Sequence, residues 1–182
     1  NTTNGYTGVR ADFTLPDSTT LTTYYTLPQF RRPVLPGALR NNEVKLDKES
    51  GHLQLWGVLL SRKDMFGEVS GDLGYVGATD SDSPSLATRD RRLHNLTARL
   101  YRDAKPGVPD FEIEGITQFG RAHVNLAPGS PWQDVAASAA HAQVGYLFKA
   151  SWKPRIALEY AFASGDGPGG RDGRFDTLFG MR

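Results

Sequence analysis

Charged and amide side chains recur at alternate positions in several stretches of this sequence. The clearest stretch is Asp110–Arg121, where Glu112, Glu114 and Gln118 fall between apolar residues and Ile116 is the single exception. Side chains of a strand point alternately to its two faces, so this pattern predicts a strand with one charged face and one apolar face.

The same alternation in other stretches extends the charged face into a set of candidate functional residues. These residues are Arg10, Asp12, Asp72, Arg99, Glu112, Glu114, Gln118, His141, Gln143, Arg155 and Glu159. If the face encloses a pore, its mixed charges set up a transverse field and select solutes by charge. They also pair with neighbours and keep the face hydrated, and the two roles are compatible. The signs are nearly balanced, which weakens the case for an exclusively anion-selective face.

Two other motifs give weaker signals for metal or phosphate binding. Asp166, Asp172 and Asp176 lie among glycines, but their spacing matches neither the EF-hand nor the nonapeptide calcium repeat, which favours a flexible surface loop. The glycine-rich run 165–170 lacks the Lys-Ser/Thr pair and the helix that follow a phosphate-binding loop. The sequence therefore predicts no metal and no cofactor.

A hydrolytic pair is the remaining catalytic possibility. His141 and Ser138 are three positions apart, which places them on opposite faces of a strand. Nucleophilic catalysis needs a nucleophile and a base within hydrogen-bonding reach, and no pair in the sequence meets that condition. We predict no catalytic residues and no enzymatic activity.

The composition excludes several classes of protein. The chain has 182 residues, a formal net charge of +1 and no cysteine, so disulfides, thiol chemistry and cysteine-based metal sites are excluded. The near-neutral charge argues against a nucleic-acid partner. No run approaches the roughly 20 apolar residues that a membrane-spanning helix needs. Barrel strands escape that test, because half of each strand is polar.

The predicted fold class is all-β, with about eight long strands. The expected strands are Tyr6–Leu15, Thr20–Leu27, Leu53–Ser61, Gly67–Gly77, Arg91–Tyr101, Asp110–Arg121, Val135–Phe148 and Arg155–Ala163. In Leu53–Ser61 both faces carry large apolar residues, so the pattern leaves the facing of this strand open.

The connections between these strands alternate in length. The short ones are Pro16–Thr19, Arg62–Phe66, Arg102–Pro109 and Lys149–Lys153, and the long ones are Pro28–His52, Ala78–Asp90, Ala122–Asp134 and the chain from Ser164 onward. This regularity is typical of an antiparallel up-and-down meander in a transmembrane barrel, and a Greek-key sandwich gives no reason for it. Phe111 and Phe119 lie about 26 Å apart along their strand, longer than the usual strand of about five or six residues.

The ends of the sequence suggest a piece of a longer protein. It begins Asn-Thr-Thr-Asn, without a Met or a signal peptide, and stops within a stretch that reads as a loop or a new element. We expect residues 1–182 to form a single partial barrel domain. Its sheet is then open, with the first and last strands unpaired on one side.

Several motifs together resemble one family. They are Arg89-Asp90-Arg91-Arg92-Leu93-His94, Asp110–Gly120, Pro154–Tyr160 with Ala163-Ser164-Gly165-Asp166, and Arg174–Gly180. From about Trp56 onward the chain resembles the alginate-export family of Gram-negative outer-membrane porins. The resemblance implies a segment of a larger monomeric barrel that acts as a passive channel in the bacterial outer membrane, and it implies no cofactor.

The resemblance also implies the partners. Outer-membrane lipid would surround the barrel, and a polar or anionic saccharide, or another small solute, would pass through it. Periplasmic export machinery is a further partner that the resemblance leaves open.

Within the central strand, Glu112 and Glu114 are expected to line a water-filled passage, while Phe111, Ile113 and Phe119 face lipid. The short turns are expected to face the periplasm and the long loops the outside.

Two alternatives come from other classes of protein. A soluble eight-stranded β-barrel that binds a ligand would need apolar residues inside, whereas the predicted inner face carries Glu, Arg and Gln. It would also close by pairing Tyr6–Leu15 with Arg155–Ala163. An outer-membrane barrel enzyme would need a catalytic pair, which the sequence does not supply.

Overall fold

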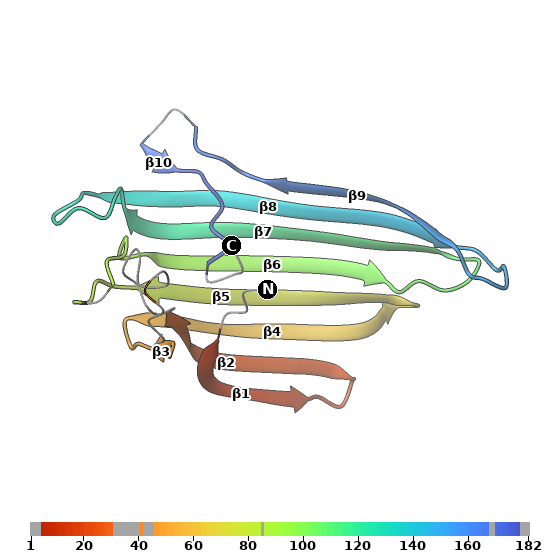
Figure 1. Ribbon diagram of the computed structural model, residues 1–182. Helices are drawn as coiled ribbons and strands as arrows, with labels where there is room; N and C mark the ends of the chain where they lie inside the picture. The colour runs from red at the N-terminus through yellow and green to blue at the C-terminus, as the bar shows by residue number, and fades with distance from the viewer. Residues whose placement is uncertain (1–4, 31–40, 42–45, 85, 168–169, 179–182) are drawn as a thin grey trace.

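The computed structural model describes residues 5–30, 41, 46–84, 86–167 and 170–178, and it consists of strands joined by turns and loops (Figure 1). The strands are β1 (Tyr6–Thr14), β2 (Thr19–Phe30), β3 (Lys48–Glu49), β4 (Leu53–Phe66), β5 (Val69–Asp80), β6 (Arg92–Arg102), β7 (Pro109–His123), β8 (Trp132–Leu147), β9 (Arg155–Ala163) and β10 (Arg171–Asp172). No helix of the described residues is long and apolar enough to cross a membrane.

The long strands form one antiparallel meander. Each pairs with its neighbour in the chain in the order β1, β2, β4, β5, β6, β7, β8, β9, as the alternating pattern predicts. The two short strands lie off this path: β3 pairs with β2, and β10 runs parallel to β8. The predicted antiparallel meander of long strands is confirmed, and the two-residue strand β10 adds one parallel pairing where the chain doubles back beside the end of β8 that β9 does not reach.

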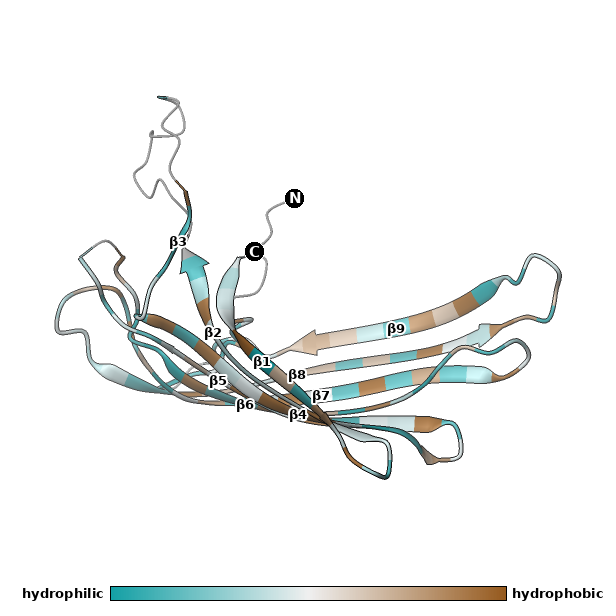
Figure 2. Cartoon of the chain, turned by 90° about the horizontal axis from the view of Figure 1, so that it is seen from below, coloured by the Kyte–Doolittle hydropathy of each residue, from teal (hydrophilic) through white to brown (hydrophobic). Residues whose placement is uncertain are grey.

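The sheet is open. Strands β1 and β9 lie at its two edges, and within the described residues no ladder joins them. Figure 2 shows that the sheet is curved rather than flat. A soluble eight-stranded barrel would need the β1–β9 ladder to close, so the structure argues against that alternative.

The two faces of the sheet differ in polarity, and Figure 2 shows the alternation along the strands. One face carries large apolar side chains that no described part of the chain covers: Leu158 is 74% exposed, Leu73 60% and Ile113 57%. We call this the apolar face. The other face carries the predicted charged residues and is called the polar face. In β4, Trp56, Val58 and Leu60 share the apolar face and Leu55 and Leu59 the polar face, which decides the facing left open by the pattern.

A small core lies on the polar face near the long connections. Leu93, Ala122 and Val135 are buried there, and Leu178 packs against them. Leu178 reaches this position because residues 172–178, called the strap from here on, leave β10 and pass over β8 and β7 (Figure 1).

Several strand ends differ from the prediction. The short turn expected at Arg62–Phe66 belongs to β4, which continues to Phe66 through a bulge where Asp64 has φ 52°. A bulge inserts residues without ending the ladder, so hydropathy alone places the strand end too early. Strand β8 likewise begins at Trp132 rather than Val135. Residues 31–40 and 42–45 of the predicted loop Pro28–His52 lie outside the described residues.

Gly57 provides a test of packing on the polar face. A Cβ at Gly57 would lie 2.6 Å from the ring of Tyr24 on the neighbouring strand. We expect Gly57→Val to displace this ring and to lower the free energy of unfolding by about 1–3 kcal/mol, as overpacking does. Chemical denaturation of the full-length protein measures the change.

The matched control is Gly115→Val. A Cβ at Gly115 would meet no atom within 4 Å, so this variant should unfold at nearly the wild-type denaturant concentration. Equal stability of the Gly57 and Gly115 variants would contradict the packing of Tyr24 over β4.

Candidate functional site

Every predicted candidate residue projects from the polar face. The strand registers align them into rows that cross several strands. One row joins Asp72, Arg99, Glu114 and His141 on β5 to β8. The next row toward the short turns joins Glu112, Gln143 and Glu159 on β7 to β9.

Arg99 is the centre of the largest charged network on this face. Its guanidinium lies 2.9 Å from a carboxylate oxygen of Glu112 and 3.4 Å from one of Asp72. The ring of Tyr101 lies beneath the same guanidinium, with its centroid 4.4 Å from Cζ. One cation thus joins carboxylates from β5 and β7 and links the two rows across three strands.

His141 extends this network toward β9. Its Nε2 lies 3.1 Å from Oε1 of Glu159, and its Nδ1 lies 3.7 Å from Oε1 of Glu112. Glu114, in the row of Arg99, accepts a hydrogen bond of 3.1 Å from the hydroxyl of Thr97. These contacts join predicted residues of β5 to β9 into one continuous polar surface, which comprises Asp72, Arg99, Glu112, Glu114, His141 and Glu159.

Arg155 forms a second cluster near the short turns. Its guanidinium pairs with the buried carboxylate of Asp110 and donates a 2.7 Å hydrogen bond to the side-chain carbonyl of Gln143. A Cβ at Gly145 would lie 2.5 Å from the Arg155 guanidinium and 2.6 Å from the Asp110 carboxylate. Only a residue without a side chain leaves room for this pair to cross β8.

The structure does not bring the whole predicted set together. Arg10 and Asp12 form their own exposed pair of 2.9 Å on β1, and Asp12 also accepts a 2.5 Å hydrogen bond from Thr22. Gln118 lies apart from both groups, because the strap covers it completely and leaves it 0% exposed. Gln118 is thus a support for the strap instead of an open surface residue.

The amide of Gln118 is satisfied almost entirely by the strap. It accepts a hydrogen bond from the backbone N–H of Asp176 and donates one to the backbone carbonyl of the same residue, both at 2.9 Å. It also donates to Asn95 Oδ1 at 2.9 Å. This reciprocal pair of hydrogen bonds resembles the backbone pairing of two residues on neighbouring strands, and it fixes the strap over β7.

Arginines from the long connection before β6 provide the remaining anchors of the strap. Arg91 bridges Asp176 at 2.6 Å and Asp80 at 2.5 Å, and Arg89 pairs with Asp172 at 2.7 Å. The prediction of a flexible surface loop around Asp172 and Asp176 is therefore wrong. These carboxylates find fixed guanidinium partners on a loop more than eighty residues earlier in the chain, a pairing that local spacing does not reveal.

The described residues contain no group of three or more His, Cys, Asp or Glu that could hold a metal ion. His141 and Ser138 lie on opposite faces of β8, as their spacing predicts. The chemistry that the polar face offers is hydrogen bonding, ion pairing and hydration.

Sequence reasoning missed several members of these clusters. Asp110 precedes Glu112 by two positions, so the period-two pattern already contained the signal that places it on the polar face. Tyr101 and Thr97 are on the same face as Arg99 by the same rule. Arg89 and Arg91 lie in a loop, where no periodicity applies.

In a comparison with protein-family models, the chain matches the model described as alginate export over residues 1–181. The chain belongs to the alginate-export family. The match covers β1 and β2 as well as the region from about Trp56 onward that carries the resemblance in sequence. This is an outer-membrane porin family with a transport function, and it is not a family of enzymes. Comparison with curated proteins finds no match, and comparison with solved structures finds none either.

The anchoring of the strap should depend on pH. Burial raises the pKa of Asp172, but hydrogen bonds with Arg89, with the Asp166 side chain and with the backbone N–H of Arg174 lower it more, so the pKa lies below its ordinary value. A carboxylate with a depressed pKa contributes stability that is fully present above its unfolded pKa of about 3.9 and is lost as pH falls through the folded value. We expect hydrogen-exchange protection of the Asp176 amide to fall below about pH 4.

The variant Asp172→Asn should show reduced protection already at neutral pH and a weaker dependence on acid. The matched control is Asp17→Asn, because the Asp17–Arg62 pair is 3.2 Å long, half-exposed on both sides and lies at the short turns, away from the strap. If both variants kept wild-type protection factors, corrected for intrinsic exchange, the Arg89–Asp172 pair would not anchor the strap.

Proposed function

We propose that this sheet forms part of the wall of an outer-membrane β-barrel channel of the alginate-export type. The polar face lines a water-filled passage, and the apolar face contacts membrane lipid. One observation carries the proposal: a continuous charged network around Arg99 lies directly behind a band of exposed, uncovered apolar side chains. A transmembrane barrel satisfies both faces, with water inside and lipid outside.

The free energies of transfer into lipid favour only one assignment of the two faces, with the apolar face toward lipid and the polar face toward water. A charged side chain on the lipid face near the middle of the bilayer costs up to about 2–4 kcal/mol, with carboxylates at the lower end. Burial of a side chain such as Ile113 or Leu158 is favourable by about 1.5–3 kcal/mol. The reverse assignment would place Glu112 and Glu114 in lipid and a whole apolar band in water.

The exposed apolar band has aromatic residues toward both ends, as expected where a barrel meets the membrane interfaces. Phe119 and Trp132 lie near the long connections and are 42% and 45% exposed. Tyr146 and Phe148 lie near the short turns, and their rings contact edge to face with centroids 4.9 Å apart. We place the short turns in the periplasm and the long connections outside.

The polar face suits passive passage of a polar or anionic saccharide. Arg99 and Arg155 are both engaged by carboxylates, so neither stands as a free cation. This part of the wall therefore offers many hydrogen-bond donors and acceptors without a local excess of positive charge. A saccharide rich in hydroxyl groups can exchange hydrogen bonds along such a surface without binding tightly at one point.

Cysteine labelling tests the assignment of the faces. The described strand β7 places Glu114 and Ile113 on opposite faces, and the sequence contains no native cysteine. In the full-length protein, Glu114→Cys should react with a small charged thiol reagent added in water, whereas Ile113→Cys should not. Equal reaction at both positions, or reaction at position 113 alone, would contradict the proposed faces.

Protease accessibility tests the orientation. We expect a protease site inserted into the connection 124–131 to be cut when protease is added to intact cells. The same site inserted into the turn 103–108 is the matched control and should be cut only after the outer membrane is opened. Cleavage restricted to the 103–108 insertion would reverse the orientation of the barrel.

A further inference from the structure

A row of arginines crosses the apolar face at the end of the strands near the long connections. Arg92 on β6 lies opposite Arg121 on β7, Arg121 lies opposite Asp134 on β8, and Asp134 lies opposite Arg171 on β10. Three guanidinium groups and one carboxylate therefore share one level of the sheet. Like charges directly opposite each other on paired strands are destabilising, so the Arg92–Arg121 pair needs compensation.

Other groups of the protein offset the positive charge of these arginines only in part. Arg121 and Asp134 are 3.5 Å apart, but both side chains are more than 60% exposed, which makes their attraction weak. Arg92 stacks on Trp132 with its Cζ 5.1 Å from the ring centroid. The side chain of Arg171 makes no hydrogen bond or ion pair with any residue that the structure describes. An excess of positive charge remains on the surface.

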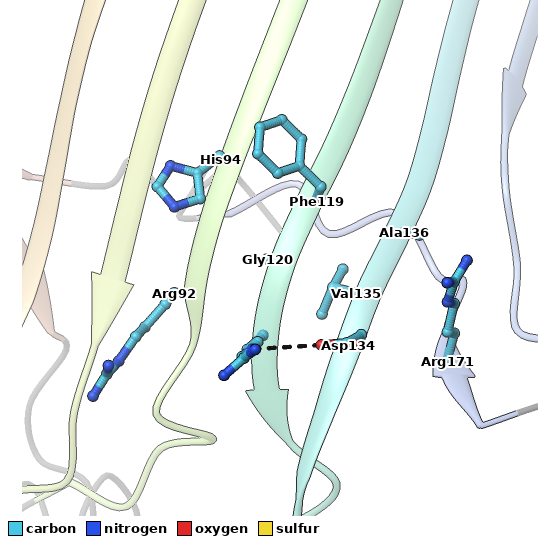
Figure 3. A pocket seen from close by; sticks show the side chains of 9 residues that line it. Arg92, His94, Phe119, Gly120, Asp134, Val135, Ala136 and Arg171 are labelled. Atoms are coloured by element: carbon cyan, nitrogen blue, oxygen red, sulfur yellow. Dashed lines mark ion pairs between the residues drawn. The ribbon is translucent and has the colours of Figure 1, made fainter.

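The arginines surround a groove of about 540 Å³ that also has an aromatic side (Figure 3). His94 and Phe119 occupy the next row toward the middle of the sheet, with their rings stacked at a centroid distance of 5.4 Å. Ala136, a small residue on the same face, lines the groove beside them. Cationic groups above aromatic rings match the level at which lipid headgroups meet the hydrocarbon.

A second, apolar groove of about 640 Å³ continues from there toward the middle of the strands. Leu73, Leu96 and Ala98 line it, together with Gly115, where an added Cβ would meet no atom within 4 Å. Leu96 follows His94 on the same face of β6, so the two grooves lie one beneath the other on the apolar face. Together, the two grooves complement the shape and polarity of a lipid that has an anionic headgroup followed by an acyl chain.

We propose that Arg92, Arg121 and Arg171 bind the phosphate group of an outer-leaflet lipid whose acyl chain lies in the groove beside Gly115. Guanidinium groups bind phosphate oxygens through paired, charge-assisted hydrogen bonds, and a phosphate between them relieves the repulsion of Arg92 and Arg121. This inference rests on the proposed function, because it needs the apolar face to contact lipid. It concerns a surface outside the channel that the transport role does not require.

Native mass spectrometry of the full-length protein tests the site. The probes are phosphatidic acid, diacylglycerol with the same acyl chains, and inorganic phosphate. The protein should retain phosphatidic acid at lower concentration than diacylglycerol. Each Arg→Gln change should weaken phosphatidic acid binding about fivefold, which corresponds to about 1 kcal/mol per basic residue, and should leave diacylglycerol unaffected.

The matched control removes the same charge at the opposite rim, as Arg62→Gln, Lys63→Gln and Lys153→Gln together, and should bind phosphatidic acid like the wild type. Arg171→Gln alone is the safest single variant, because its side chain has no described partner to lose. Gly115→Leu should fill the lower groove and weaken retention of both lipids.

The outcomes separate the two proposals. Equal retention of phosphatidic acid and diacylglycerol, or no loss in the arginine variants, would overturn the phosphate site alone. Displacement of phosphatidic acid by inorganic phosphate at comparable concentrations would assign the arginines to a free anion and overturn the lipid. Retention of neither lipid by the wild-type protein would overturn the lipid-facing surface and with it the proposed function.

Discussion

The structure depends on the pairing register of strands β4 to β8. A shift of one residue between neighbouring strands would move every side chain of the shifted strand to the opposite face. Glu112 and Glu114 would then enter the apolar band, and Ile113 would enter the charged network. The bridge from Arg99 to Asp72, directly opposite on β5, and to Glu112, diagonally opposite on β7, favours the observed register of three strands, because a shift of one residue would move one of these charges to the other face.

The strap changes the shape of the polar face without altering the sheet. It removes Gln118 and Asn95 from the surface and replaces them with a short segment held by two arginines. The charged network around Arg99 lies farther toward the short turns and stays open. In the proposed channel, the strap side is thus the narrower part of this wall, and the solute meets the Arg99 and Arg155 clusters beyond it.

Residues of different polarity also occupy successive rows on the apolar face. The arginine row, the aromatic row of His94 and Phe119, and the aliphatic residues around Leu96 follow one another along the strands. This order matches the passage from headgroups to hydrocarbon in a membrane. The positive row therefore has a physical place in the proposed setting, at the level of the lipid phosphate groups.

The period-two pattern of the sequence by itself determined the all-β fold, the order of the strands and the face on which each predicted residue lies. It did so because facing along a strand is a local property, set by whether a position is odd or even. It even contained the placement of Asp110, two positions before Glu112, although that residue was not selected. The family resemblance rested on equally local motifs, and the family match over residues 1–181 agrees with it.

Only the tertiary structure decided which of these residues meet. Arg155 and Asp110 are 45 positions apart, and Arg89 and Asp172 are 83 apart. Such pairs depend on the registers of all intervening strands and, for the strap, on a loop that folds back beside β8. The same holds for the bulge that extends β4 to Phe66 and for the burial of Gln118. Alternation in the sequence tells which side of the sheet a side chain occupies, but contact requires that distant segments arrive at the same level, and that is a property of the whole fold.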